Sequence, residues 1–496
     1  MARRRVTPTG LAKKHLWYIN DDEARLAKID RYIRGEHDLP YMPDTADAEY
    51  RLLANRAVSN WSPLVIGTVA QSLYVDAHRP GKDSLPREEK GSPTSATTHS
   101  PQWTFWQRNR LDGRQATLYR SALGFGQAFV GVHKGADGLA VVKLYSAMHS
   151  SALWRDPAND ESPYSFFTIE EYPNPTDNER GIARMWDEEF EYELSFQSEG
   201  DVRVVRKAPH GASSCPIVRF APHVGLEGEV TGLVEPMIPL QDRINQTVFD
   251  LLVAQTYSSF KVRTVAGMAP PVEMEAVEID GPDGKQVVMK PKIDPNTGQP
   301  VPKPINLNAK RLLIAKDKDA KFGTLDETPL DGFIESIDMS IRHLSAIQQI
   351  PPHHLLGQIA NLSAEALAAA ETSLSRKIEE FRKTFGESWE RVFRLASELE
   401  GIPGADDYHS EVVWRDVGAH SLAQTADGLG KLAEALDIPK RGLWPRVSGV
   451  SQGEIDRWTD LYEEDQAMLR AAERLAQNTA GRRPRPPASN NAGAEE

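Results

Sequence analysis

The chain has almost no cysteine and no long apolar run. Cys215 is the single cysteine among 496 residues, which excludes an intramolecular disulfide and any metal site built from several thiolates. We therefore expect Cys215 to be a buried, inert thiol. No stretch approaches the roughly 18 consecutive apolar residues of a membrane span, and the basic start Met1–Arg5 has no apolar segment behind it. The sequence predicts neither a membrane partner nor a secretory signal.

An excess of basic residues is also missing. Lys and Arg number 58 against 71 Asp and Glu, and the formal net charge is −13. Proteins that grip DNA phosphates usually present a basic face, because counterion release supplies much of their affinity. An acidic chain that handles DNA is expected to enclose the duplex rather than hold it. With 40% hydrophobic and 26% charged residues, the composition is that of a soluble globular protein with about two to four structural regions.

Motifs for nucleotide or metal chemistry are weak. Gly284-Lys285-Gln286 lacks the upstream glycine and the hydroxyl residue of a phosphate-binding loop, so no nucleotide site is predicted. His353 and His354 are adjacent, but no Asp, Glu or His at metal-ligand spacing accompanies them in the nearby sequence. The sequence therefore predicts no metal, no cofactor and no catalytic residue.

Two further motifs near the C-terminus have simpler explanations. Gly449–Gly453 matches the G-x-S-x-G elbow of esterases, but that elbow needs a preceding strand, and a proline-containing turn precedes it here. Ser451 followed by Glu454 fits a helix-capping box instead. A helix-turn-helix in residues 421–466 is disfavoured, because residues 400–470 contain 14 acidic against 7 basic residues, and phosphates would repel them.

The hydropathy pattern of the first half predicts an α+β fold. Residues 1–75 have apolar residues at helical spacing, residues 79–101 are polar and rich in turn-forming residues, and a helix is expected from Asp112 to Leu123. Residues 124–222 then show strand chemistry. Apolar and polar side chains alternate from Phe190 to Phe196, which predicts a half-buried strand, and most of this stretch is expected to be antiparallel β.

The second half is expected to be mainly helical around one inserted module. Helices are predicted over 233–262, 328–349 and 363–400, where apolar residues recur every three or four positions. Residues 263–327 lose this pattern and contain eight prolines between Pro270 and Pro304, which predicts loops and strands. Short helices are expected over 401–480, and a disordered, proline-rich tail over 481–496.

Four segments near the long predicted helices share a pattern with one known family. They are Glu235–Asn245 (EPMIPLQDRIN), Leu330–Ile334 (LDGFI), Gln349–Gly357 (QIPPHHLLG) and Asn361–Ala366 (NLSAEA). These segments resemble the portal proteins of tailed bacteriophages, particularly phages of actinobacteria. The similarity runs from about residue 25 to 460 and is strongest between residues 233 and 390. It implies a dodecameric ring at one capsid vertex, built from a chain that is not an enzyme.

The resemblance implies a portal-type fold with a definite division of the chain. Its expected parts are a wing (1–232 with the spine helix 363–400), two stem helices (233–262 and 328–349), an inserted proline-rich α/β clip (263–327), a tunnel loop (350–362), a helical crown (401–480) and a disordered tail (481–496). The residue pattern independently supports one feature of this scheme. Two helices of stem length bracket a proline-rich module, as a hairpin with an inserted tip would.

The resemblance also implies where DNA and protein partners meet the chain. The tunnel loop would form the narrowest part of the channel, and it contains no Lys, Arg, Asp or Glu. We expect weak, exchangeable contacts with DNA there, from the polar residues His353, His354, Gln358 and Asn361. The polar face of the second stem helix is expected to face the channel and leans acidic, with Asp331, Glu335 and Asp338 against Arg342.

The expected clip has segregated charge. Residues 271–284 carry five acidic and no basic residues, whereas residues 285–321 carry nine basic against three acidic residues. Such a split predicts a docking surface that pairs neighbouring clips or attracts an acidic partner, with Lys285, Lys290 and Lys292 as its candidate residues. A solvated hairpin with incidental charge is the alternative explanation.

The expected partners follow from the resemblance. They are further copies of the chain, double-stranded DNA passing through the channel, the terminase large subunit, a head-completion or adaptor protein and the major capsid protein, with scaffold as a further candidate. The expected location is the portal vertex of the virion, after assembly in the host cytoplasm. Two other classes stay open at this point: another virion structural protein, such as a minor head or adaptor subunit, and a nucleic-acid-processing enzyme of the packaging machinery.

Overall fold

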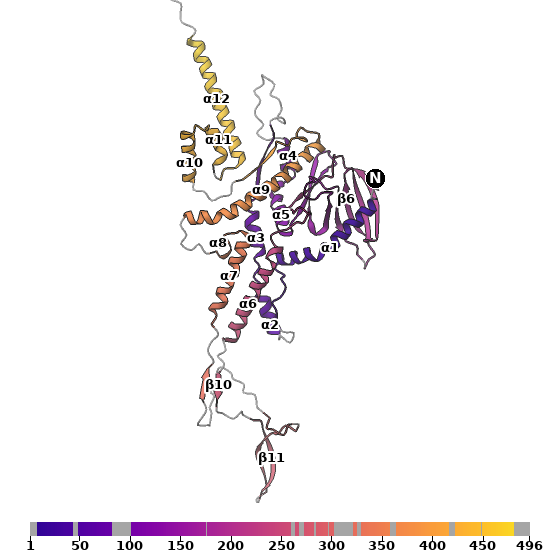
Figure 1. Ribbon diagram of the computed structural model, residues 1–496, viewed down its shortest axis with the longest axis vertical. Helices are drawn as coiled ribbons and strands as arrows, with labels where there is room; N and C mark the ends of the chain where they lie inside the picture. The colour runs from indigo at the N-terminus through magenta and orange to yellow at the C-terminus, as the bar shows by residue number, and fades with distance from the viewer. Residues whose placement is uncertain are drawn as a thin grey trace, which may run out of the picture. The chain divides into compact units, whose positions relative to one another are not determined.

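The computed structural model combines helices and strands throughout (Figure 1). It describes residues 7–42, 48–81, 101–174, 176–258, 263–266, 272–281, 284–295, 297–301, 321–324, 329–357, 364–415, 422–447 and 449–480. The α+β class expected from the sequence is confirmed. The expected loop at 79–101 and tail at 481–496, and the candidate residues Gln358 and Asn361, lie largely or wholly outside the described residues.

The helices include the three long ones that the sequence predicts in the second half. They are α1 (Pro8–Arg34), α2 (Ala48–Arg56), α3 (Ser62–Ala70), α4 (Pro101–Arg108), α5 (Leu111–Phe125), α6 (Ile238–Ser258), α7 (Asp331–Gln348), α8 (Pro352–Leu356), α9 (Ala364–Glu400), α10 (Leu422–Ala435), α11 (Lys440–Leu443) and α12 (Gln452–Ala480). Three short 3-10 turns, η2 (Ala147–His149), η3 (Glu235–Met237) and η4 (Trp444–Arg446), accompany them. The helices expected over 233–262, 328–349 and 363–400 correspond to η3 with α6, to α7 and to α9.

The strands form antiparallel sheets. They are β1 (Val75–Arg79), β2 (Ala128–Lys134), β3 (Ala140–Ser146), β4 (Ser150–Leu153), β5 (Ser165–Glu171), β6 (Gly181–Asp187), β7 (Phe190–Ser198), β8 (Asp201–Pro209), β9 (Ile217–Phe220), β10 (Arg263–Ala266), β11 (Met274–Gly281), β12 (Gly284–Pro291), β13 (Lys321–Thr324) and β14 (Glu411–Trp414). Five of them follow one another as the meander β4-β5-β6-β7-β8, and a second sheet has the order β3-β2-β9. The antiparallel β-structure expected over 124–222 is confirmed.

The chain divides into two compact units, and the division falls within α6 and α7. Unit 1 comprises Met1–Leu39, Val58–Asn245 and Met339–Glu496, and unit 2 comprises Pro40–Ala57 and Gln246–Asp338. Unit 1 therefore contains the two large sheets, and unit 2 contains the strands β10 to β13.

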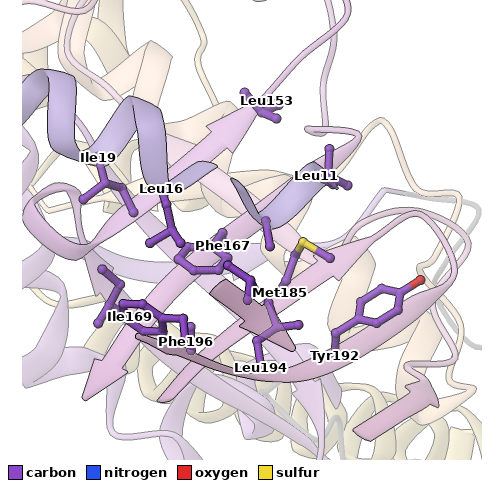
Figure 2. Packing of buried hydrophobic residues seen from close by; sticks show 13 residues of the cluster. Leu11, Leu16, Ile19, Leu153, Phe167, Ile169, Met185, Tyr192, Leu194 and Phe196 are labelled. Atoms are coloured by element: carbon purple, nitrogen blue, oxygen red, sulfur yellow. The ribbon is translucent and has the colours of Figure 1, made fainter. Parts of the chain in front are cut away.

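Helix α1 shows how local sequence signals produce a buried face in unit 1. Thr7 caps the first turn by accepting a hydrogen bond from the N–H of Gly10 (3.2 Å), and Pro8 suits the first helical position. Gly35 ends the helix with a φ of 82°, a conformation that glycine adopts without strain. Leu16 and Ile19 then pack with Phe167, Met185, Leu194 and Phe196 of the five-stranded sheet, as Figure 2 shows. This apolar contact fixes α1 along the sheet.

A second part of the unit 1 core is aromatic and centres on α9. Trp389 and Phe385 are fully buried, and the Trp389 ring meets Trp106 edge-on, with ring centroids 4.8 Å apart. Trp389 Nε1 donates a hydrogen bond to Tyr119 Oη (2.7 Å), which satisfies the indole N–H inside the core. Helix α9 has 37 residues and is therefore about 55 Å long. It extends from this core to its own N-terminal part, beside α8.

Unit 2 has a small core of its own. Leu53 and Ala54 of α2 pack with Phe249 of α6 and with the half-buried Val248 and Leu252. Its strands form two separate pairs, β10 with β13 and β11 with β12. The loops and strands expected over 263–327 are therefore confirmed for the described residues of that range.

The expectation of short helices over residues 401–480 is wrong in two places. Strand β14 lies in this range and pairs antiparallel with β1, more than 300 residues earlier, so Val75 lies opposite Trp414. Helix α12 has 29 residues, and the capping box expected at its start is confirmed. Ser451 N–H donates to Glu454 Oε2 (3.0 Å), and Glu454 N–H donates to Ser451 Oγ (3.4 Å).

The structure shows the environment of Cys215 and the apolar character of the described helices. Cys215 is fully buried, and burial raises the pKa of its thiol well above the ordinary value, as expected of an inert side chain. Within the described part of the chain, none of the helices combines the length and apolar character needed to cross a bilayer.

Candidate functional site

The end of α7 is held by a set of hydrogen bonds within unit 1. Helix α7 ends at Gln348, and the chain turns at Gln349, whose φ of 53° lies in the left-handed region. Ile350 N–H donates to the Ser345 carbonyl (3.0 Å), and Ser345 Oγ donates back to the Ile350 carbonyl. The Gln348 side chain donates to the carbonyl of Leu233 (2.8 Å). These bonds satisfy backbone groups that the end of a helix leaves unpaired.

A buried lysine completes this helix end. Lys377 of α9 donates from Nζ to the carbonyl of Gln348 (2.7 Å), and its side chain is 9% exposed. An ammonium group complements the partial negative charge at a helix C-terminus. Burial lowers the pKa of Lys377 to about 8, because an apolar environment disfavours the charged form. The bond ties the end of α7 to α9.

Helix α8 presents the two adjacent histidines to α9. The helix has five residues and ends at Gly357, whose φ of 67° is left-handed. His353 Nε2 lies 2.8 Å and His354 Nε2 lies 2.9 Å from the same atom, Glu371 Oε1. Because a carboxylate oxygen only accepts, both imidazoles donate to it. We call residues 345–357 of α7 and α8, with residues 371–377 of α9, the junction.

The junction corrects one conclusion from the sequence. No carboxylate accompanies His353 and His354 in the nearby sequence, and the prediction that they lack one was wrong. In the folded chain Glu371 contacts both histidines. Sequence reasoning missed Glu371 and Lys377, although a signal was present. Both residues occur on the apolar stripe of α9, at helical spacing from Leu374, and charged residues at such positions indicate buried polar contacts.

The four candidate stem residues share one face of α7, because they are spaced by four, three and four positions. Asp331, Glu335 and Arg342 are exposed, and Asp338 is half-buried. The division between the units falls after Asp338, so Arg342 belongs to unit 1 and the three acids to unit 2. The unit 2 part of this face is therefore acidic.

The candidate clip lysines lie on or beside β12. Strands β11 and β12 form a hairpin in which Glu275 lies opposite Lys290 and Asp280 lies opposite Lys285. Just outside it, Lys292 Nζ is 3.2 Å from Glu273 Oε2. Three of the acidic positions before residue 284 thus lie beside three basic positions after it within one chain. The predicted docking role of Lys285, Lys290 and Lys292 stays a prediction.

The same hairpin leaves large apolar side chains in solvent. Val287, Met289 and Met274 are 64%, 55% and 49% exposed. They share one face of the hairpin with Ala276, because residues two apart in a strand point the same way and Met289 lies opposite Ala276. Two-stranded hairpins are marginal by themselves, so this face is suited to contact with another surface.

Two long helices, α6 and α7, flank the strands β10 to β13 along the chain, and comparison with known proteins identifies the class to which this arrangement belongs. The family model described as "Phage portal protein, SPP1 Gp6-like" matches residues 13–468. The chain therefore belongs to this family, and the resemblance noted in its sequence is confirmed.

Two named relatives agree with this family. The chain is 31% identical over 180 residues to the "Portal protein" of Mycobacterium phage D29, a match that covers 36% of each chain. It is 24% identical over 385 residues to the "Portal protein" of Mycobacterium phage L5, covering 74% of this chain and 71% of that relative. The match thus spans about a third of the first relative and most of the second. Both relatives come from phages of an actinobacterium, as the sequence pattern suggested.

Proposed function

We propose that this chain assembles into a closed ring at one vertex of a phage capsid and serves as the conduit for DNA packaging and ejection. The ring is expected to contain twelve copies. Its proposed partners are the terminase large subunit during packaging, then a head-completion or adaptor protein, with the major capsid protein and scaffold around it. In this proposal residues 263–327 form the clip, α6 and α7 the stem, residues 350–362 the tunnel loop and α9 the spine of the wing.

The apolar face of the β11–β12 hairpin is the observation that most directly supports assembly. A ring of identical subunits needs a heterologous contact, in which different surfaces of one subunit meet. Exposed Val287 and Met289 offer one such surface. Helix α7 offers a second, because Ile334, Met339 and Ile347 are each more than half exposed although they belong to a strongly amphipathic helix.

Sedimentation velocity and negative-stain electron microscopy of the purified chain test this proposal. Twelve copies of a 55.1 kDa chain predict a particle of about 660 kDa with a central hole. A chain that sediments as a monomer at every concentration contradicts the proposal. A closed particle without a central hole would favour a different virion structural protein, such as an adaptor.

The channel is proposed to hold DNA loosely. Each phosphate neutralised by Lys or Arg adds affinity and salt dependence, and such contacts would slow a moving duplex. The candidate channel face of α7 instead offers Asp331, Glu335 and Asp338 against Arg342. The acidic balance of this face supports a bore that repels the backbone and confines the duplex by its shape.

Charge reversal tests the loose-channel proposal. The double variant D331K/E335K replaces two negative charges by two positive ones on exposed positions of the proposed bore and so changes the net charge by +4 per subunit. We expect intact rings, slower packaging, and retention of DNA that weakens as salt is raised. The matched control E464K/D465K makes the same charge change on exposed positions of α12. If both variants package DNA at the same rate, this face of α7 does not meet DNA, whereas a loss of rings in D331K/E335K would place it in the subunit interface.

A further inference from the structure

The cluster of His353, His354 and Glu371 has the composition and spacing of a metal site. One ligand atom from each residue lies within 4.8 Å of the other two. The side chain of His353 is 13% exposed, and those of Glu371 and His354 are 34% and 36% exposed. The cluster is therefore partly exposed, so that an ion and water can reach it from solvent.

The donor set identifies the class of ion. Two imidazole nitrogens and one carboxylate oxygen are a common three-residue set for zinc, with a fourth position left to water. Hard cations such as Mg²⁺ and Ca²⁺ prefer sites made of oxygen atoms alone. We propose that His353, His354 and Glu371 bind one Zn²⁺ ion per chain, with a water molecule as the fourth ligand.

The distances are compatible with this ion. Bonds of about 2.0–2.2 Å in a tetrahedral site separate the ligand atoms by about 3.4 Å. The two Nε2–Oε1 distances are 2.8 and 2.9 Å, about 0.5 Å shorter than this separation, and the three ligand atoms all lie within 4.8 Å of one another. A neutral imidazole then carries its proton on Nδ1 and turns the lone pair of Nε2 toward the ion.

The surrounding structure holds the ligands in place. Glu371 projects from α9, and Lys377 on the same helix anchors the end of α7 through the Gln348 carbonyl. Helix α8 lies between that anchor and the left-handed Gly357, so both of its ends are constrained. An ion bound here would cross-link α8 to α9. Because a metal that binds only the folded state stabilises it by mass action, it would also stabilise the junction.

Metal binding to the purified, untagged chain is the experiment. The protein is stripped with EDTA, dialysed against ZnCl₂ alone and analysed for bound zinc per chain, and the affinity is measured by calorimetry. We expect one equivalent in the wild type and a higher melting temperature with zinc. The H353N/H354N and E371Q variants should lose that equivalent or bind it at least about tenfold more weakly, because changes outside the ligand set already cost 10- to 100-fold.

Matched controls separate this site from general binding by histidine and glutamate. H409Q changes an exposed histidine in a loop, and E379Q removes an exposed carboxylate two turns further along α9. Both are expected to bind zinc as the wild type does. Less than one equivalent in the wild type, or equal binding by E371Q and E379Q, overturns the proposal. Neither DNA nor terminase enters the measurement, so its result is independent of the proposed channel function.

Discussion

The core around α9 and the β11–β12 hairpin use apolar side chains in opposite ways. In unit 1, Trp106, Trp186 and Trp389 are almost completely buried within the chain. In unit 2, Val287 and Met289 are 64% and 55% exposed, although they are also large and apolar. Apolar surface stabilises a fold only when it leaves water. The comparison teaches that the aromatic core of unit 1 is stabilised by burial within its own chain, whereas the hairpin keeps apolar surface in water, where the proposed subunit interface would cover it.

The largest expected effect comes from breaking the unit 1 core. The W389A variant leaves a cavity among packed aromatic rings and removes the hydrogen bond to Tyr119. We expect it to lower the free energy of unfolding by about 3–5 kcal/mol, as other large-to-small substitutions in cores do. Thermal and denaturant unfolding followed by circular dichroism will measure this. W17A is the control, since Trp17 is 49% exposed, and equal losses in the two variants would show that Trp389 is not central to the core.

The next largest effect is an acid sensitivity confined to unit 1. The Ser165 hydroxyl donates its proton to the Trp186 carbonyl, so His15 Nε2 is the donor in its hydrogen bond to Ser165 Oγ (2.9 Å). Burial lowers the pKa of His15 to about 3. Burial likewise lowers the pKa of His133 to about 3 and that of His78 to about 4.

The sign of this effect follows from proton binding. The ordinary pKa of histidine is 6.5, and below that pH these histidines bind protons in the unfolded chain but stay neutral in the folded chain. The free energy of unfolding therefore falls by about 1.4 kcal/mol per pH unit for each such histidine. The loss should continue toward pH 3 to 4. In H15Q, whose amide can still donate to Ser165, this slope should be shallower between pH 6.5 and 4. The control H409Q should keep the wild-type slope, and an unchanged slope in H15Q would contradict the assignment.

A third prediction concerns the exposed face of the hairpin. Replacing both apolar residues in V287S/M289S should leave the monomer's melting temperature nearly unchanged, because surface substitutions usually alter stability by less than about 0.5 kcal/mol. Ring formation should weaken, as seen by a shift toward monomer in sedimentation velocity. V205S is the control, because Val205 of β8 is 62% exposed but lies in unit 1. If V205S and V287S/M289S assemble equally well, the hairpin face is not an interface.

The smallest effect on assembly is expected from the hairpin charges. K290E/K292E places like charges beside Glu275 and Glu273, which should cost less than about 1 kcal/mol in a solvated hairpin. The fourfold exchange E273K/E275K/K290E/K292E restores opposite pairs with their positions inverted. If it recovers assembly and packaging, the charges serve the hairpin itself. If assembly and packaging are not recovered while the hairpin stays folded, a partner binds the basic strand, as the sequence suggested.

Much of the fold could be predicted because it depends on local periodicity. The stripe through Leu374, Phe381 and Trp389 predicted α9, and the alternation from Phe190 to Phe196 predicted β7. Burial confirmed the inward positions in both. The capping box at Ser451 was also visible, because its partner lies three residues away. Helical and strand periods require only neighbours in the sequence, so one chain is enough to recognise them.

Long-range contacts were decided only by the tertiary structure. Strand β14 was missed because its pairing partner, β1, lies more than 300 residues away, and four residues alone carry little strand signal. The candidate site shows the same limit. His353 and His354 could be selected as unusual, but their contact with Glu371 depends on a chain reversal that places α8 against α9.

The sequence by itself determined the family, the α+β class and the order of the long helices. It also determined which of the residues 271–321 are acidic and which are basic. Only the tertiary structure decided that these opposite charges face each other across β11 and β12, and that the imidazoles of α8 share one carboxylate. The physical reason is that composition and periodicity are properties of neighbouring residues. Side-chain contacts between distant segments instead depend on how the chain folds back upon itself.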